Sequence, residues 1–332
     1  MLPLTLCAYR NRTMLHRFAA CLALAFALAG TAQAQWPERP IKIVVPFPAG
    51  GPTDVVTRVL ADKLSQALGQ AVVIDNRPGA GGSIGSDFVA KSAPDGYTLL
   101  MSTGSSHSVG PSLQKLPYDP VRDFTPIVYV GYATNIMLAS PMLAANTVAE
   151  FIEAAKKDPG RYNYATSGIG SVAHLTAEMF AAQAGIKLTH VPYKGTQLSI
   201  PDLIQGNVSI LFDSVTTAKP HVEGKRLKAL GISSLKRSEI VPDIPTISES
   251  GLPGFESWNY FGLFGPANLP RVITERVNTE TNHIVADPAM RERFHQLGFE
   301  ITGGTPGDFA TVISTETAKW SKVIHDANVK PE

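Results

Sequence analysis

Two stretches of the 332-residue chain share one order of elements: a strand, a glycine-rich loop, a helix that ends at a glycine, and a second strand. In the first stretch, the apolar and mostly β-branched residues 41–45 precede the glycine- and proline-rich loop 46–52. Apolar residues then recur at helical spacing up to Leu68, Gly69 ends the helix, and residues 71–74 form the next strand. This order predicts a βαβ unit with a glycine-rich first turn.

The same order returns about 120 residues later. Residues 162–165 predict a strand, the loop 166–171 follows it, and a helix then runs to Gly185 before a further strand at 187–191. Strands and helices continue to alternate along the rest of the chain. This alternation predicts an α/β protein with two doubly wound, mostly parallel α/β domains of similar plan.

Residues 1–34 have the pattern of a secretory signal peptide. Three arginines and no acidic residue precede or border a 13-residue apolar run, residues 18–30, which is too short to span a bilayer core of roughly 30 Å. Ala32-Gln33-Ala34 then forms a cleavage motif. We therefore expect export and cleavage after Ala34, with either Met1 or Met14 as the start of translation.

Loss of that segment would remove both cysteines, Cys7 and Cys21, and with them any thiol, disulfide or cysteine-bound metal. The whole chain has a formal net charge of +1, which argues against a basic surface for nucleic acid. Its histidines form no H-x-x-H or H-E-x-x-H motif. We therefore expect no metal site, no cofactor and no nucleic-acid partner.

Loops rich in glycine and small hydroxyl residues follow the predicted strands. Ligands of α/β sheets bind beyond the carboxyl ends of strands, and glycines let an anion approach the unpaired N–H groups of a helix N-terminus. Few of these positions carry a cationic side chain, so we predict a small anion, a carboxylate, held by backbone amides and hydroxyls. The candidate binding residues of these loops are Gly50, Gly51, Thr53, Ser105, Ser106, Ser167, Gly168, Gly170 and Ser171.

Four further polar residues join this set, and each has a structural alternative. His107 and His174 follow candidate loops and fit either ligand contact or a helix-start histidine bonded to a nearby carbonyl. Asp54 fits either ligand contact or an acidic residue favoured by the helix dipole. Asp213, at a strand end, fits either a pocket acceptor or a helix cap.

Two short enzyme motifs also occur, each in an unfavourable context. Gly81-Gly82-Ser83-Ile84-Gly85 matches the G-x-S-x-G of hydrolases, but a long loop separates it from the preceding strand, whereas a nucleophile elbow needs a tight turn. Gly168-Ile169-Gly170-Ser171-Val172-Ala173 matches a dinucleotide-binding motif, but the next strand lacks the acidic residue that would bind a ribose. An exported hydrolase that uses Ser83 is the alternative to a binding protein.

Seven motifs, in order along the chain, resemble the Bug family, the extracytoplasmic solute receptors of tripartite tricarboxylate transporters. They are Trp36-Pro37-x-x-Pro40, Pro46-Phe47-Pro48-Ala49-Gly50-Gly51-x-Thr53-Asp54, Asn76-Arg77-Pro78-Gly79-Ala80-Gly81-Gly82, Pro94-Asp95-Gly96-Tyr97-Thr98-Leu99-Leu100, Thr166-Ser167-Gly168-x-Gly170-Ser171-x-x-His174-Leu175, Val191-Pro192-Tyr193-Lys194-Gly195 and Pro242-Asp243-x-Pro245-Thr246. One run departs from the family pattern, because Gln197-Leu198-Ser199-Ile200-Pro201 replaces a Pro-Ala-type segment.

The resemblance implies a periplasmic binding protein of Venus flytrap architecture, with a ligand cleft between domain 1 (residues 35–136 plus 258–332) and domain 2 (residues 137–257). It implies a monomer that is not embedded in the membrane, performs no chemistry and hands a carboxylate to a membrane permease. A sensor of the same ligand without a transport role remains open. The resemblance also adds ligand-binding residues: Pro48, Ala49, Thr103, Tyr193 and Lys194.

Overall fold

The computed structural model describes residues 36–113, 115–327 and 329, so the predicted signal peptide at 1–34 lies outside the described residues. The chain divides into a short unit, Met1–Glu38, and a compact unit, Arg39–Glu332. All helices and strands below belong to the second unit. In the described part of the chain, no helix is both long and apolar enough to cross a membrane.

The first strand group is a parallel sheet in which β1 (Ile41–Val45) lies between β2 (Val72–Asn76) and β3 (Thr98–Thr103). Helices α2 (Pro52–Leu68) and α3 (Ser83–Ala90) connect these strands. The continuous apolar sequence of β1 fits a strand that is covered on both faces, since four of its five side chains are buried. The predicted first βαβ unit is confirmed.

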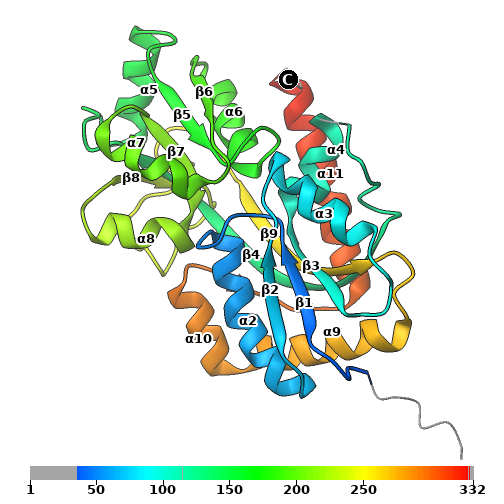
Figure 1. The fold of residues 1–332 in the computed structure, drawn as a ribbon. Coiled ribbons are helices and arrows are strands. Elements are labelled where there is room, and N and C mark those ends of the chain that lie inside the picture. Colours follow the sequence, from blue (N-terminus) through cyan, green and yellow to red (C-terminus); the bar gives the residue numbers. More distant parts are fainter. Residues whose placement is uncertain (1–35, 114, 328, 330–332) are drawn as a thin grey trace, which may run out of the picture. The chain divides into compact units, whose positions relative to one another are not determined.

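The second strand group repeats this plan. Here β5 (Asn163–Thr166) lies between β6 (Thr189–Pro192) and β7 (Ile210–Ser214), again in parallel. Helices α6 (Val172–Ala184) and α7 (Ile200–Gln205) make the connections. Figure 1 shows the two groups at opposite ends of the sheet, in the orders β2-β1-β3 and β7-β5-β6.

Two long strands that the sequence patterns did not predict join the groups into one sheet. Strand β4 (Phe124–Ala139) pairs antiparallel with β9 (Trp258–Pro266), and β9 also pairs antiparallel with β3. The last residues of β4 change partners and pair with β7 and with β8 (Lys228–Ile232). The strand order is β2-β1-β3-β9-β4-β7-β5-β6, so the expectation of mostly parallel strands holds within the two groups and is wrong for the strands between them.

Strand β4 escapes detection because its pattern is broken. Pro126 cannot donate to the ladder, and the register with β9 shifts beside Pro126 and again beside Tyr129. At Gly131 an added Cβ would lie 2.0 Å from the carbonyl oxygen of Glu300, which belongs to the short strand β10 (Glu300–Ile301). Only glycine allows that close approach of two backbones.

The predicted domain borders stay predictions. The border at 136/137 lies close to the point where β4 changes partners between Thr134 and Asn135, and the border at 257/258 coincides with the start of β9. The remaining helices cover the sheet. They are α4 (Gly110–Leu113), α5 (Val148–Lys157), α8 (Val215–Glu223), α9 (Arg271–Ala286), α10 (Pro288–Gln296) and α11 (Pro306–Asp326).

Each strand group has its own aromatic core. In the first, Phe309 of α11 packs on Phe264 and Tyr260 of β9, with ring centroids 4.7 and 5.9 Å apart. In the second, Phe180 of α6 packs on Phe212 of β7 at 5.6 Å. Tyr260, Phe261 and Phe264 of β9 are buried and act as packing residues. These cores fix the strand ends that carry the candidate site.

Candidate ligand-binding site

A cavity of about 60 Å³ lies where the carboxyl ends of the strands in the two groups face each other. Six of the residues expected from the sequence line it, namely Pro48, Gly51, Thr53, Ser105, Ser167 and Asp213. The loops that follow β1 and β6 meet beside it, since an added Cβ on Gly195 would lie 2.9 Å from Pro48 Cγ. Neutral and apolar groups make up most of the wall, and Asp213 is its one ionisable side chain among the described residues.

A second cavity of about 240 Å³ adjoins the first and shares Phe47 and Ser167 with it. It takes in three other expected residues, Gly168, Tyr193 and Lys194, together with the loop Gly79–Gly82. The hydroxyl of Tyr193 donates to Asp202 Oδ2 at 2.6 Å. The remaining expected residues line neither cavity: Ala49, Gly50, Asp54, Thr103, Ser106, His107, Gly170, Ser171 and His174.

Asp54 shapes the loop before α2. Its carboxylate accepts hydrogen bonds from the N–H of Gly50 at 2.9 Å, from Asn76 Nδ2 at 2.9 Å and from both Nε and Nη2 of Arg58. Burial opposes ionisation of Asp54, but the bonds from Arg58, Gly50 and Asn76 hold its pKa below the usual value. Asp54 therefore holds the loop without lining the cavity, and the Gly50 N–H already donates to the Asp54 carboxylate.

The N-terminus of α2 faces the cavity without a side-chain cap. Gly51 is the N-cap residue, no side chain in the described part of the chain accepts from the first turn, and Pro52 has no N–H. Thr53 is 3 % exposed and lines the cavity. A helix N-terminus with amides free of side-chain partners favours an anion.

The N-terminus of α6 differs, because side chains already bind two of its first-turn amides, those of Val172 and His174. Ser171 Oγ accepts from the N–H of His174 at 3.1 Å, and Ser105 Oγ accepts from the N–H of Val172 at 3.1 Å. His174 Nδ1 faces the N–H of Gly170 at 3.4 Å. Ser105 keeps its own hydroxyl proton, so it can donate into the cavity while it holds α6.

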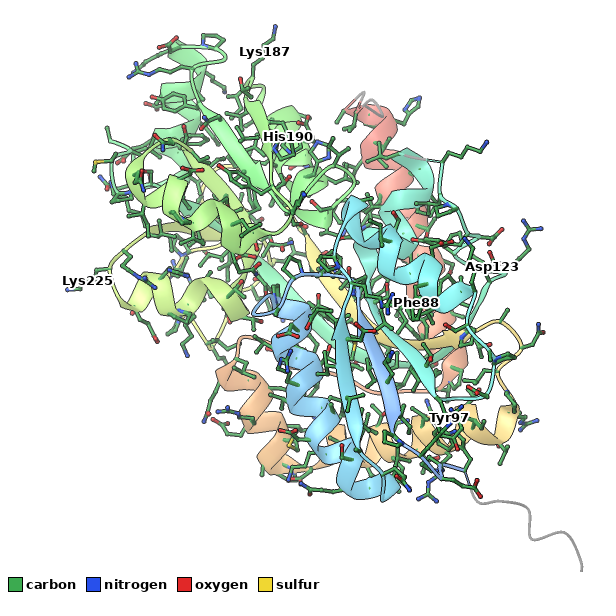
Figure 2. The ribbon with its side chains drawn as sticks, viewed as in Figure 1. Phe88, Tyr97, Asp123, Lys187, His190 and Lys225 are labelled. Carbon is green, nitrogen blue, oxygen red and sulfur yellow. The ribbon has the colours of Figure 1, made fainter. Side chains whose placement is uncertain are left out.

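His107 is buried behind the cavity wall in the π-helical turn Ser105–Val109. Its Nδ1 lies 2.8 Å from Ser102 Oγ, and its ring stacks on Phe264 at 4.2 Å. Burial lowers the pKa of His107 to about 3, so the ring is neutral at pH 7. His174 is also neutral, because burial and the neighbouring His190 lower its pKa to about 3. His190, which is labelled in Figure 2, stacks on His174 at 4.3 Å.

Asp213 is the penultimate residue of β7, and its side chain is buried against the cavity. Thr196 Oγ1 donates to Oδ1 at 2.9 Å, and Thr217 Oγ1 donates to Oδ2 at 2.7 Å. Burial raises the pKa of Asp213 to about 6, although hydrogen bonds from Thr217, Ser214 and Thr196 oppose the shift. Asp213 is therefore mostly ionised at pH 7 and has hydroxyl donors as partners.

Sequence analysis missed several residues of the cavity wall. Asn135 and Asn259 lie on β4 and β9, the two strands that were not predicted. Asn259 Oδ1 accepts from the N–H of Gly104 at 3.1 Å, and Asn135 Nδ2 donates to Ser257 Oγ at 3.0 Å. Gln197 was noticed only as a departure from the family pattern. Pro52 and Gly195 belong to the loops 48–54 and 193–195, which the family resemblance implies as ligand-contacting. The other missed wall residues are Phe47, Val172, Ala173, Thr196, Phe212 and Ser214.

Ser83 does not lie on a nucleophile elbow. It is the first residue of α3, and residues 77–82, including a 3₁₀ turn, separate that helix from the end of β2. Its side chain is buried. The long connection matches the objection raised from the sequence. Within the described residues, no group of three or more His, Cys, Asp or Glu side chains could hold a metal ion.

Comparison with known proteins adds independent findings. The profile of the "Tripartite tricarboxylate transporter family receptor" matches residues 56–329. Protein BugT of Bordetella pertussis is 36% identical over 320 residues, which cover 95% of this chain and 98% of BugT.

Solved structures agree with that match. R. palustris Rpa4515 with adipate has a TM-score of 0.87 and 34% identity, and the match covers 90% of this chain and 100% of that one. MatC (Rpa3494) from Rhodopseudomonas palustris with bound malate has a TM-score of 0.83 and 31% identity, with 87% of this chain and 100% of that one covered. The chain is thus similar in sequence and fold to receptors solved with carboxylates.

Proposed function

Because this chain belongs to the tripartite tricarboxylate transporter receptor family, we propose that it is a periplasmic receptor that captures a small carboxylate and delivers it to a membrane permease. Members of the family are substrate-binding receptors, so the chain is a receptor and not an enzyme. The hydrolase alternative with Ser83 as nucleophile is set aside on the same ground.

One observation carries the ligand class. The N-terminus of α2 lies at the cavity with no side-chain cap, and the hydroxyls of Thr53 and Ser105 line the same space. Amides of a first helical turn and neutral hydroxyls stabilise a carboxylate without a cationic partner. The relatives solved with adipate and with malate support the same class for this chain.

Capture would couple the two strand groups. A ligand in this cavity touches Gly51 and Thr53 of the first group and Ser167 and Thr196 of the second. The ligand therefore has a higher affinity for the closed form, in which both groups contact it, than for an open form in which the groups are apart. This difference in affinity shifts the population towards the closed form. The proposed domains, residues 35–136 with 258–332 and residues 137–257, would be the two moving parts.

A binding screen tests the ligand class. Purified chain is melted with acetate, succinate, malate and adipate, and with glucose and putrescine as neutral and cationic controls. A carboxylate at about 100 times its Kd stabilises the native state by roughly 2.7 kcal/mol, which gives a clear rise in Tm. Stabilisation by glucose or putrescine, with no response to any carboxylate, would refute the proposal.

A transport assay tests delivery. Cells that lack the receptor should lose uptake of the labelled carboxylate, and the wild-type chain should restore it. Normal uptake without the receptor would contradict delivery and favour a sensor of the same ligand.

A further inference from the structure

The ionisable group in the cavity wall is an acid, although the ligand proposed for that cavity is an anion. Asp213 is 4 % exposed and lines the cavity, while none of the described residues that line it is basic. Lys194, the cationic residue expected at the site, lines the neighbouring cavity instead. Repulsion between a carboxylate ligand and the Asp213 carboxylate must therefore be offset by a favourable contact.

Three donors from the protein already hold Asp213: the hydroxyls of Thr196 and Thr217 and the backbone N–H of Ser214. An ionised carboxylate offers about four acceptor positions. The fourth has no partner from the protein in the described residues. Each carboxylate oxygen already accepts one hydrogen bond, and a donor on the ligand would add a charge-assisted hydrogen bond at the remaining position.

Thr196 cannot supply that donor to the ligand, because its hydroxyl proton goes to Asp213. Its oxygen accepts in turn from Gln197 Nε2 at 3.3 Å, so the three side chains form one chain of hydrogen bonds with a fixed direction. The Gln197 amide also reaches the opposite wall, where an added Cβ on Gly51 would lie 3.1 Å from its Nε2. Gln197 therefore borders the space between Asp213 and the α2 N-terminus.

From this arrangement we propose that the cavity selects a carboxylate with a hydrogen-bond donor, a hydroxyl or an ammonium group, close to the carboxylate, and that Asp213 accepts from that donor. This inference rests on the proposed function and narrows it. The ligand carboxylate lies at the uncapped N-terminus of α2, and its donor group lies on the Asp213 side. An unsubstituted dicarboxylate has no proton to donate and leaves the fourth acceptor position unpaired.

Titration calorimetry at pH 7.5 with three ligands of one size tests the selection. Succinate has no donor, malate adds a hydroxyl and aspartate adds an ammonium group. We expect malate, aspartate or both to bind ten- to a hundredfold more tightly than succinate, the loss for one hydrogen bond to a charged group. Tighter binding of malate alone assigns the hydroxyl, and tighter binding of aspartate alone assigns the ammonium group.

Succinate bound as tightly as both substituted ligands would overturn the inference and leave the proposed receptor function intact. No binding of any carboxylate, including acetate and adipate, would overturn both. This ligand series uses the wild-type chain, so it does not depend on whether a variant folds.

The variant Asp213→Asn tests the acceptor directly. It should reduce the preference for the donor-bearing ligand over succinate to about threefold or less, because the charged acceptor is lost. The matched control is Asp62→Asn, which makes the same change on the exposed surface of α2 and should keep the full preference. A folded Asp213→Asn protein with wild-type preference would overturn the assignment.

Discussion

The N-termini of α2 and α6 occupy equivalent places in the two strand groups, yet their amides have different partners. Ser171 and Ser105 bind amides in the first turn of α6, whereas the first turn of α2 has Gly51 as its N-cap and no side-chain cap in the described residues. A glycine-rich loop before a helix is thus not by itself an anion site. What decides is whether hydroxyls of the protein already occupy the amides.

This contrast indicates a structural role for the N-terminus of α6 and a ligand-binding role for that of α2. The α6 N-terminus connects the two strand groups, because the N–H of Val172 in the second group donates to Ser105 Oγ, which follows β3 of the first group. These two residues are 67 positions apart in the sequence. The α2 N-terminus is available to a ligand. That amides of both glycine-rich loops bind the same anion stays a prediction, and four variants and one pH series test it.

The largest effect is expected for Gly51→Val. The backbone there is extended, with φ −76°, so the substitution is not strained. An added Cβ would lie 3.1 Å from Gln197 Nε2 and 3.2 Å from the Pro48 carbonyl oxygen, and the valine methyl groups would fill the cavity. Calorimetry should show at least a hundredfold loss of carboxylate affinity.

Gly170→Val is the matched substitution at the α6 loop. Gly170 has φ +73°, so valine there should cost about 1–2 kcal/mol of stability. It lies outside both cavities, and the folded variant should bind within about threefold of wild type. Equal losses of affinity in the two variants would contradict the proposal that the ligand binds at the N-terminus of α2 and not at that of α6.

Thr53→Val should come next in size. The side chain keeps its shape but loses the hydroxyl that lines the cavity beside the α2 N-terminus. Loss of one hydrogen bond to a charged group corresponds to a ten- to hundredfold higher Kd. The measurement is titration with the tightest ligand of the screen. A Kd equal to that of wild type would remove Thr53 from the site.

The third effect is a pH dependence that originates in Asp213. Its pKa of about 6 is raised by burial, and a ligand donor would stabilise the ionised form. Affinity should therefore be full near pH 7.5 and fall about tenfold by pH 5, where only about a tenth of Asp213 is ionised. His107 and His174, with pKa values of about 3, do not titrate in this range.

The Asp213→Asn variant provides the correction for the ligand's own titration, because its remaining pH dependence comes from the other groups. An affinity that rises on acidification, after this correction, would mean that Asp213 binds a proton together with the anion. That result would contradict its role as an acceptor.

The smallest effect is expected for Ser171→Ala. This change removes the side-chain cap of α6, and caps of this kind contribute about 1 kcal/mol of stability. Chemical denaturation should show that loss, while ligand affinity stays within about twofold. An affinity loss of tenfold or more would mean that Ser171 contacts the ligand and does not only cap α6.

Much of the fold follows from local sequence. Strands β1 and β5 are short and mostly buried, and apolar residues recur at helical spacing in the helices that follow them. Gly69 and Gly185 end those helices in the left-handed conformation expected of a C-terminal glycine. Strands β4 and β9 were missed because their pairing depends on distant partners and their pattern is broken by Pro126 and by shifts of register.

The site was predictable only in part for the same reason. Sequence indicated the loops that carry Gly51, Thr53 and Ser167, because glycine and hydroxyl residues follow strands there. It could not indicate that Asp54 occupies the Gly50 amide, or that Ser105 occupies the Val172 amide. Asn135 and Asn259 were missed with the strands that carry them.

A crystal structure of the chain with its tightest carboxylate would show directly which helix N-terminus binds the anion. We expect ligand carboxylate oxygens within 2.7–3.2 Å of the first-turn amides of α2 and of Thr53 Oγ1, with the Ser105–Val172 hydrogen bond intact. A carboxylate seated on the amides of α6, with Ser105 displaced from Val172, would contradict it.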